Sequence, residues 1–178
     1  MTTHSRESGF SLVELLVAAT VFTFVVTGVS GLFVTALDIQ RRATGVQKIE
    51  ENAQFALESI AREVRVSTIT SGDTDCANQG PGTSTLTIQH PTNGTVIYAY
   101  DRTSTTGAIL RNGQPITSGD VDITAFAFCV SGSGPDGAQS RVTIPLTIQS
   151  LAGRPSLRVN VSLQTSVVSR DLSVDLTQ

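Results

Sequence analysis

The sequence predicts an α+β protein in which one long amino-terminal helix packs against an antiparallel β-sheet head. Three observations support this fold class. Residues 10–39 are almost entirely apolar or small, and Glu14 and Asp38 are their only charged side chains. Apolar residues then recur at three- and four-residue spacing as far as Val64, which is typical of an amphipathic helix. Beyond Ser67, short runs of alternating apolar and polar residues indicate strands.

Residues 10–39 are long enough to span a bilayer as a helix, since about twenty apolar residues suffice. The core of a secretory signal peptide is shorter, about 7 to 15 residues. An ordinary single-span anchor has the length but no use for a buried carboxylate. A charge at the centre of such a span costs about 2.5 to 3.5 kcal/mol on insertion scales, so Glu14 is predicted to be a functional residue.

Residues 9–15, GFSLVEL, resemble the processing motif of type IV prepilins and of the pseudopilins of type II secretion systems. In that family a membrane-bound prepilin peptidase cuts after the glycine, and the new amino-terminal residue is N-methylated. The resemblance implies that residues 1–9 are a leader, that the cut lies between Gly9 and Phe10, and that Phe10 is methylated. The rest of the chain resembles, more loosely, the J-type pseudopilins and W-type minor pilins. The implied fold is type IV pilin-like.

The resemblance also implies a role for Glu14 in assembly. Lipid tails are as apolar as the helices they surround, so subunits gain little hydrophobic free energy by leaving lipid for one another. In the family, the glutamate pairs with the amino-terminal amine of a neighbouring subunit and sets the register of the incoming helix. The implied partners are the prepilin peptidase, other major and minor pilins or pseudopilins, an inner-membrane assembly platform, and membrane lipid before assembly.

The expected location is a single pass through the inner (cytoplasmic) membrane with the head outside the cytoplasm, followed by a pilus or a periplasmic pseudopilus. The leader contains one Arg and one Glu, and Arg41 and Arg42 follow the span. The positive-inside rule therefore does not decide the orientation, which rests on the resemblance.

Residues 40–66 are predicted to continue the helix, giving a stem about 85 Å long at 1.5 Å per residue. Glu58 and Arg62 form a favourable pair four residues apart. The charged face is either solvated or lines neighbouring stems. The apolar positions of the stem are Ile39, Val46, Ile49, Ala53, Ala56, Leu57, Ile60 and Val64, and the charged positions are Arg41, Arg42, Lys48, Glu50, Glu51, Glu58, Arg62, Glu63 and Arg65.

Residues 67–178 are predicted to form one β-rich head. Residues 71–84 are rich in Gly, Ser, Thr, Asn and Asp and are typical of a loop. Asn112-Gly113 predicts a tight hairpin turn. Pro145 predicts an edge strand or a bulge. The expected strands are 85–90, 95–101, 108–111, 121–130, 140–149 and 156–168, and the last has Leu157, Val159, Val161 and Leu163 on one face.

Cys76 and Cys129 are the only two cysteines. A head outside the cytoplasm would lie in an oxidising compartment, where disulfides persist. We therefore expect a Cys76–Cys129 disulfide. Two buried thiols are the alternative.

No arrangement of residues predicts an enzyme. The head has one histidine, His90, and lacks the nucleophile-elbow, zinc-protease and phosphate-loop motifs. No cofactor or metal is expected, although Asp73, Asp75, Asp120, Asp122 and Asp136 lie in glycine-containing loops of the kind that calcium uses. Direct binding of nucleic acid is not expected, because the head has six Arg against eight acidic residues and no basic run.

The sequence thus favours a minor type IV pilin, a structural subunit processed by prepilin peptidase and built into a pilus or its tip and initiation complex. A minor pseudopilin of a type II secretion system is the alternative, since both classes have the motif. A membrane-anchored extracytoplasmic binding module is the second alternative, in which the stem is only a tether.

Overall fold

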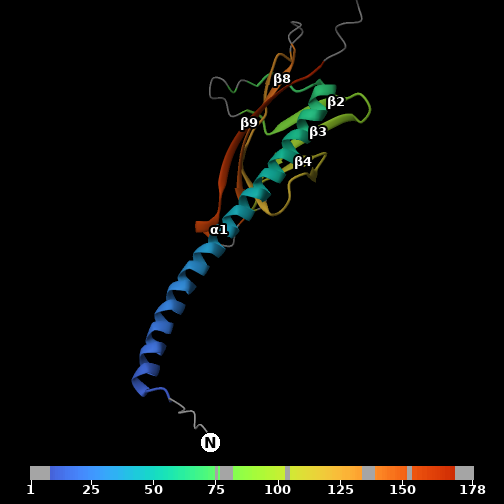
Figure 1. Ribbon diagram of the computed structural model, residues 1–178. Coiled ribbons are helices and arrows are strands. Elements are labelled where there is room, and N and C mark those ends of the chain that lie inside the picture. The colour runs from blue at the N-terminus through green and yellow to red at the C-terminus, as the bar shows by residue number, and fades with distance from the viewer. Residues whose placement is uncertain are drawn as a thin grey trace, which may run out of the picture. The chain divides into compact units, whose positions relative to one another are not determined.

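A computed structural model of the chain describes residues 9–74, 76, 82–102, 105–133, 139–151 and 154–170 (Figure 1). Contacts divide it into two compact units, Met1–Arg41 and Arg42–Gln178, here called the stem unit and the head unit. Helix α1 (Leu12–Val66) contributes residues to both units. The expected long helix over residues 10–66 is confirmed, apart from its first two residues. The leader lies outside the described residues except for Gly9, and the four-part division of the chain stays a prediction.

Within the head unit, one face of α1 is buried. Its buried residues are Ile49, Ala53, Ala56, Ile60, Ala61 and Val64. The three- and four-residue spacing places them in one stripe, as the sequence predicts. Val46 was expected in the same stripe but remains 38% exposed, so the buried stripe begins at Ile49.

The first sheet is antiparallel, with strand order β1-β2-β3-β4-β5. Its strands are β1 (Thr68–Ile69), β2 (Thr85–His90), β3 (Gly94–Asp101), β4 (Ala108–Arg111) and β5 (Gln114–Pro115). The sequence predicts β2, β3 and β4 to within one residue. The two-residue strands β1 and β5 were not expected, because they are too short to show an alternating pattern.

The expected tight turn at Asn112-Gly113 joins β4 to β5. Both residues have positive φ, 50° for Asn112 and 81° for Gly113. Positive φ at both central residues is the requirement of a type I′ hairpin turn, and Asn-Gly satisfies it with little strain. The Asn112 side-chain oxygen also accepts a hydrogen bond from the Ile97 amide at 2.8 Å, which ties the turn to β3.

The second sheet centres on β8 (Arg141–Ser150). One side of β8 pairs with β9 (Asn160–Val168), and the other side pairs with β6 (Val121–Phe126) and β7 (Cys129–Ser131) in succession. The expected strand at 121–130 is therefore two strands with a short interruption. The expected strand at 156–168 begins later, at Asn160, because Pro155–Leu157 forms a 3₁₀ turn with the proline in its first turn.

Pro145 lies in the central strand of this sheet, so the prediction of an edge strand is wrong. The Pro145 carbonyl accepts a hydrogen bond from the Ala127 amide at 3.3 Å. In a strand, the nitrogen and oxygen of one residue point to the same side, so the nitrogen of Pro145 faces the interruption between β6 and β7. Because no strand pairs with that side of β8 at this point, the absence of an N–H group on Pro145 removes no hydrogen bond from the sheet. The alternative prediction, a bulge at Pro145, is also wrong, because the register of β8 with β9 is regular there; the register shift of this sheet lies in β6, between Ile123 and Ala125.

One hydrophobic core joins the helix to both sheets. Tyr98 of β3, Ile109 of β4, Ile123 of β6 and Ile144 of β8 are completely buried in it. A bridge between Thr83 and Phe128 connects the start of β2 to the segment between β6 and β7. The head is thus an α+β fold with one long helix packed on antiparallel sheets, as predicted.

Candidate processing and assembly segment

Gly9 and Phe10 lie in a non-helical, exposed segment just before α1. The Phe10 side chain is 84% exposed. Helix α1 begins at Leu12, so the bond expected to be cut is two residues from the nearest helical residue. The peptide bond between Gly9 and Phe10 therefore lies in an exposed segment outside the helix.

Ser11 caps the helix, and Glu14 lies in its first turn. The Glu14 amide donates to the Ser11 hydroxyl at 3.2 Å, and the Leu15 amide donates to the Ser11 carbonyl at 3.2 Å. A serine followed three residues later by glutamate is the sequence of a capping box. A carboxylate in the first turn also lies at the positive end of the helix dipole. Local chemistry therefore fixes the position of Glu14 on the helix.

The stem unit presents an apolar surface. Within the described residues, α1 is the helix that is long and apolar enough to cross a membrane. No apolar side chain from Phe10 to Val34 is buried within the chain, so this surface is available for contact with lipid or with another protein. The large exposed residues are Phe10, Leu12, Val13, Leu15, Leu16, Val17, Val21, Phe22, Phe24, Val25, Val26, Val29, Leu32, Phe33 and Val34.

The hydroxyl groups of this apolar segment are satisfied within the helix. Each donates to the carbonyl four residues earlier, at 2.8 to 3.1 Å. The residues are Thr20, Thr23, Thr27, Ser30 and Thr35. At the far end, Asp38 pairs with Arg41 at 3.5 Å. Among the described residues, the Glu14 carboxylate has no hydrogen-bond or ion-pair partner. The Glu14 carboxylate is therefore the polar group of this segment that requires a partner from another molecule.

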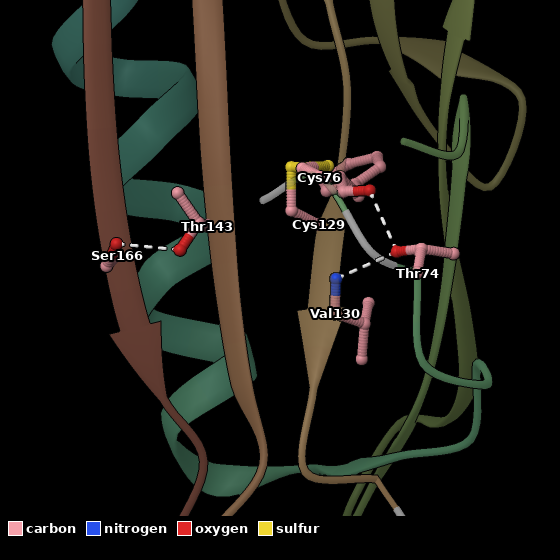
Figure 2. The surroundings of a disulfide bond; sticks show 7 residues. Thr74, Cys76, Cys129, Val130, Thr143 and Ser166 are labelled. Carbon is pink, nitrogen blue, oxygen red and sulfur yellow. Dashed lines mark hydrogen bonds between the residues drawn. A yellow bond between two sulfur atoms is a disulfide. The ribbon is translucent and has the colours of Figure 1, made fainter. Parts of the chain in front are cut away.

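The expected disulfide joins Cys76 to Cys129, with the Cα atoms 5.5 Å apart (Figure 2). Thr74 reinforces the same junction. Its hydroxyl accepts a hydrogen bond from the Val130 amide at 2.9 Å and donates to the Phe128 carbonyl at 3.2 Å. The disulfide and Thr74 together attach the loop after β1 to β7.

An ion pair that was not expected from the sequence attaches α1 to the first sheet. Arg111 of β4 donates to both carboxylate oxygens of Glu63, at 2.8 to 3.2 Å, and the Tyr98 hydroxyl donates to the same carboxylate at 2.8 Å. Glu63 was placed on the charged face of the helix, which was expected to be solvated or to contact other stems. Arg111 is the last residue of the expected strand 108–111, directly before the Asn112-Gly113 turn, and this position gave no sign of the pairing.

Burial shifts the ionisation of this cluster. Burial acts to raise the pKa of Glu63, but the hydrogen bonds from Arg111 and Tyr98 and the charge of Arg111 outweigh it, and the Glu63 pKa lies below its usual value. Burial first, and then the hydrogen bond to Glu63 and its charge, raise the pKa of Tyr98 to about 12. The cluster is therefore ionised at neutral pH as Glu63 and Arg111, with Tyr98 neutral.

The carboxylates considered for calcium have protein partners where the structure describes them. Asp73 accepts from the Ser133 hydroxyl and from the Gly132 and Ser133 amides, and these hydrogen bonds lower its pKa. Asp120 pairs with Lys48 at 3.1 Å. Asp122 accepts from the Gly107 amide at 2.8 Å and lies 3.6 Å from Arg102. Asp75 and Asp136 lie outside the described residues, and no group of three possible metal ligands occurs among the rest.

His90 has a structural contact at the turn between β2 and β3. Its Nδ1 accepts hydrogen bonds from the Thr92 and Asn93 amides, both at 3.1 Å. The ring of His90, the last residue of β2, therefore organises the turn that follows this strand.

Residues 4–30 match the family model of the prokaryotic N-terminal methylation motif. The chain therefore carries the type IV prepilin-like signal, which supports a pilin- or pseudopilin-type precursor. The motif implies processing by prepilin peptidase, assembly with other pilins and anchoring in the membrane through the amino terminus. No curated protein and no solved structure matches the chain.

Proposed function

We propose that this protein is a minor type IV pilin, a structural subunit that enters a pilus or its tip and initiation complex. The methylation motif over residues 4–30 supports this proposal most directly. An exposed apolar stem and a head with its own core also suit a subunit that moves from a membrane into a filament.

The first step is cleavage of the peptide bond between Gly9 and Phe10. Hydrolysis releases residues 1–9 and leaves a free amine on Phe10, which is then N-methylated. The exposed, non-helical state of both residues supports access by the peptidase. The helix that begins at Leu12 remains intact when the leader is removed, because its cap, Ser11, is retained.

In the second step the Glu14 carboxylate pairs with the amine of Phe10 in a neighbouring subunit. The carboxylate has no partner among the described residues and is surrounded by apolar positions along the stem. Leaving such a charge unpaired in an apolar environment is costly, while a charge pair offsets part of that cost. This interaction gives stems in the membrane a reason to associate and fixes their axial register.

The head is the part that contacts other subunits outside the membrane. The conspicuous polar clusters of the head, Glu63 with Arg111 and Asp122 with Arg102, hold its helix and sheets together. Cys76 and Cys129 add a covalent link. These roles are those of a structural subunit rather than an enzyme.

One experiment separates the candidate functions. Surface filaments are sheared from the native cells, and the amino-terminal peptide of this chain is read by mass spectrometry in the sheared and envelope fractions. Methylated Phe10 in the sheared filaments, at low abundance, is the result expected for a minor pilin. Methylated Phe10 confined to the envelope would indicate a pseudopilin of a secretion system. An uncut amino terminus in every fraction would leave a membrane-anchored binding module.

A further inference from the structure

Among the described strands, β9 pairs with β8 alone. Its register with β8 is unbroken from Asn160 opposite Gln149 to Val168 opposite Arg141. The Ser150 amide of β8 bonds to the Val159 carbonyl, and the Pro145 carbonyl faces the β6–β7 side. Main-chain groups alternate in direction along a strand, so the odd-numbered residues of β9 bond to β8 and the even-numbered residues point outward.

The outward main-chain groups are exposed and unpaired. They belong to residues 160, 162, 164, 166 and 168, and all five residues are exposed. No hydrogen bond to their amides or carbonyls occurs in the part of the chain that the structure describes. Such a row is a template on which another strand can pair.

Proteins usually protect such edges with charges, prolines, bulges or very short strands. The other edges of the head have this protection. β1 and β5 have two residues each, and β5 contains Pro115. β6 has a bulge, and its Ile123 amide bonds to Gly107. β9 has nine residues and lacks a charge, a proline and a register shift.

The inner face of β9 also has an incomplete apolar row. Leu163 lies opposite Leu146 in the register, but Leu163 is 38% exposed while Leu146 is 2% exposed. Both side chains are on the core face of the sheet, so the exposed one lies at the open margin of the core. A further strand beside β9 would bring an apolar side chain over Leu163.

On the outer face of the same sheet, β9 has no charged side chain, and hydroxyl pairs connect it to β8. The hydroxyls of Thr143 and Ser166 face each other across the two strands (Figure 2) and form a hydrogen bond of 2.8 Å, and those of Thr147 and Ser162 form one of 3.1 Å. These cross-strand pairs hold β9 flat against β8. A strand added to this edge therefore meets no charged side chain of β9, although Arg141 of β8 lies opposite Val168 at one end of the pairing.

The direction of β9 argues against a second copy of this chain as the occupant. Arg42 donates to the Ser156 carbonyl just before β9, and the Arg170 amide donates to the Arg65 carbonyl just after it. β9 therefore runs in the same direction as the part of α1 in the head unit. Two copies joined by antiparallel β9 strands would have these helices entering their heads from opposite ends, which does not suit two chains anchored in one membrane. Among the described strands, the other edges are either very short, as in β1 and β5, or interrupted by a bulge, as in β6, and so do not offer a matching strand.

We infer that the edge of β9 binds an extended, uncharged segment of a different subunit of the same filament as an additional antiparallel strand. This inference rests on the proposed function and adds the interface through which the head is recruited. The bound segment has alternating residues, apolar on the side over Leu163 and small or hydroxyl-bearing on the side beside Ser162 and Ser166. Main-chain hydrogen bonds supply the attachment, and the apolar contacts set the register.

The test uses the full chain in its native cells with two variants of one residue. Gln164→Pro removes the outward amide hydrogen at the centre of the strand without removing a bond to β8, because this nitrogen faces away from β8. Gln164→Thr changes the side chain and keeps the amide. We expect Gln164→Pro to lower the amount of the chain in the filament fraction by about tenfold or more, equivalent to about 1.4 kcal/mol. Gln164→Thr should match the wild type.

A second measurement does not depend on the folding of the proline variant. A photoreactive benzophenone amino acid replaces Ser166 on this edge or Thr95 on the exposed face of the first sheet. After irradiation, we expect a cross-link from position 166 to another chain that bears a methylated prepilin-type terminus, identified by mass spectrometry, and none from position 95.

Three results would overturn the inference. They are equal recruitment of the proline and threonine variants, a cross-link from position 166 to a second copy of this chain, and no cross-link from that position. Methylated Phe10 in wild-type filaments would show in each case that the proposed function still holds. An unprocessed wild-type chain would instead refute the proposed function itself.

Discussion

Arg111 Nη2 lies 2.8 Å from Glu63 Oε1, and the two side chains are 30% and 17% exposed. The pair connects β4 to α1 across a sequence separation of 48 residues. Because the carboxylate also accepts from Tyr98, its hydrogen-bonding capacity is well satisfied in this partly buried position.

Glu63→Gln should lower the free energy of unfolding of the head by about 1 to 3 kcal/mol, since it breaks charged hydrogen bonds in a partly buried site. Both tyrosines lie in β3, and the chain has no tryptophan, so near-ultraviolet circular dichroism of the full chain in detergent reports on the head. The control is Glu58→Gln. Glu58 pairs with Arg62 on the exposed face, where a single ion pair contributes little.

Glu63→Gln should also make the melting temperature of the head less dependent on pH in the acid range. The folded-state pKa of Glu63 lies below the usual value of 4.5, so the ionised pair stabilises the head above that pH. This stability is lost as the pH falls through the folded pKa. The melting temperature of the wild type should therefore drop more steeply than that of Glu63→Gln between about pH 5 and pH 3. If the melting temperatures of the two proteins fell in parallel with pH, the lowered pKa of Glu63 in the folded state would be contradicted.

Gly107→Ala should be severely destabilising, by about 3 kcal/mol or more. A Cβ at this position would lie 2.1 Å from the Ile123 carbonyl oxygen, where β4 approaches β6. Gly119→Ala is the matched control, since nothing lies within 4 Å of its Cβ. Thermal unfolding of the two variants measures the difference, and similar midpoints would show that the two sheets can separate at low cost.

Replacing Cys76 and Cys129 together by serine should lower the stability of the head by about 4 kcal/mol, the chain-entropy estimate for a closed loop of this length. The separation of the cysteines is 53 residues. The loop should still dock at low temperature, because Thr74 and Asp73 bond to the residues after Cys129. Near-ultraviolet spectra at low temperature and melting curves test both statements. An unchanged melting temperature in the double serine variant would contradict the predicted loss of stability.

Ser11→Ala should loosen the first turn of α1, since an N-cap substitution of this kind costs about 1 kcal/mol. The amide of Glu14, which donates to the Ser11 hydroxyl, should exchange with deuterium faster in detergent micelles. Ser11→Thr retains a hydroxyl cap and should exchange close to the wild-type rate. Equal rates in the alanine variant would show that the cap does not hold this turn.

Glu14→Gln should leave cleavage at Gly9 and methylation of Phe10 intact but lower the chain in filaments by about tenfold or more, the factor for about 1.4 kcal/mol. Glutamine keeps the main-chain amide that Ser11 caps and removes only the charge. Quantitative mass spectrometry of sheared filaments measures the ratio, with Glu58→Gln as the control. Wild-type incorporation of Glu14→Gln would refute the charge pair and leave the stem as a simple tether.

The sequence by itself determined the features that depend on local chemistry. The long helix follows from apolar spacing, the cap from Ser11 and Glu14, and the turn at Asn112-Gly113 from the φ values that these two residues tolerate. The methylation motif is contiguous, and so it is visible without any structure. Most strands were predicted because their alternation has a period of two.

Only the tertiary structure decided the features that depend on which strand lies beside which. Pro145 is tolerated in a central strand because its nitrogen meets a gap between two partner strands. Glu63 finds Arg111 only when β4 packs near the helix. The even-numbered residues of β9 have outward-facing main-chain groups because β8 pairs with the odd-numbered residues on the other side of the strand. A one-dimensional pattern specifies the face on which a side chain lies, but pairing across the chain specifies its neighbours, since those contacts join residues that are far apart in sequence.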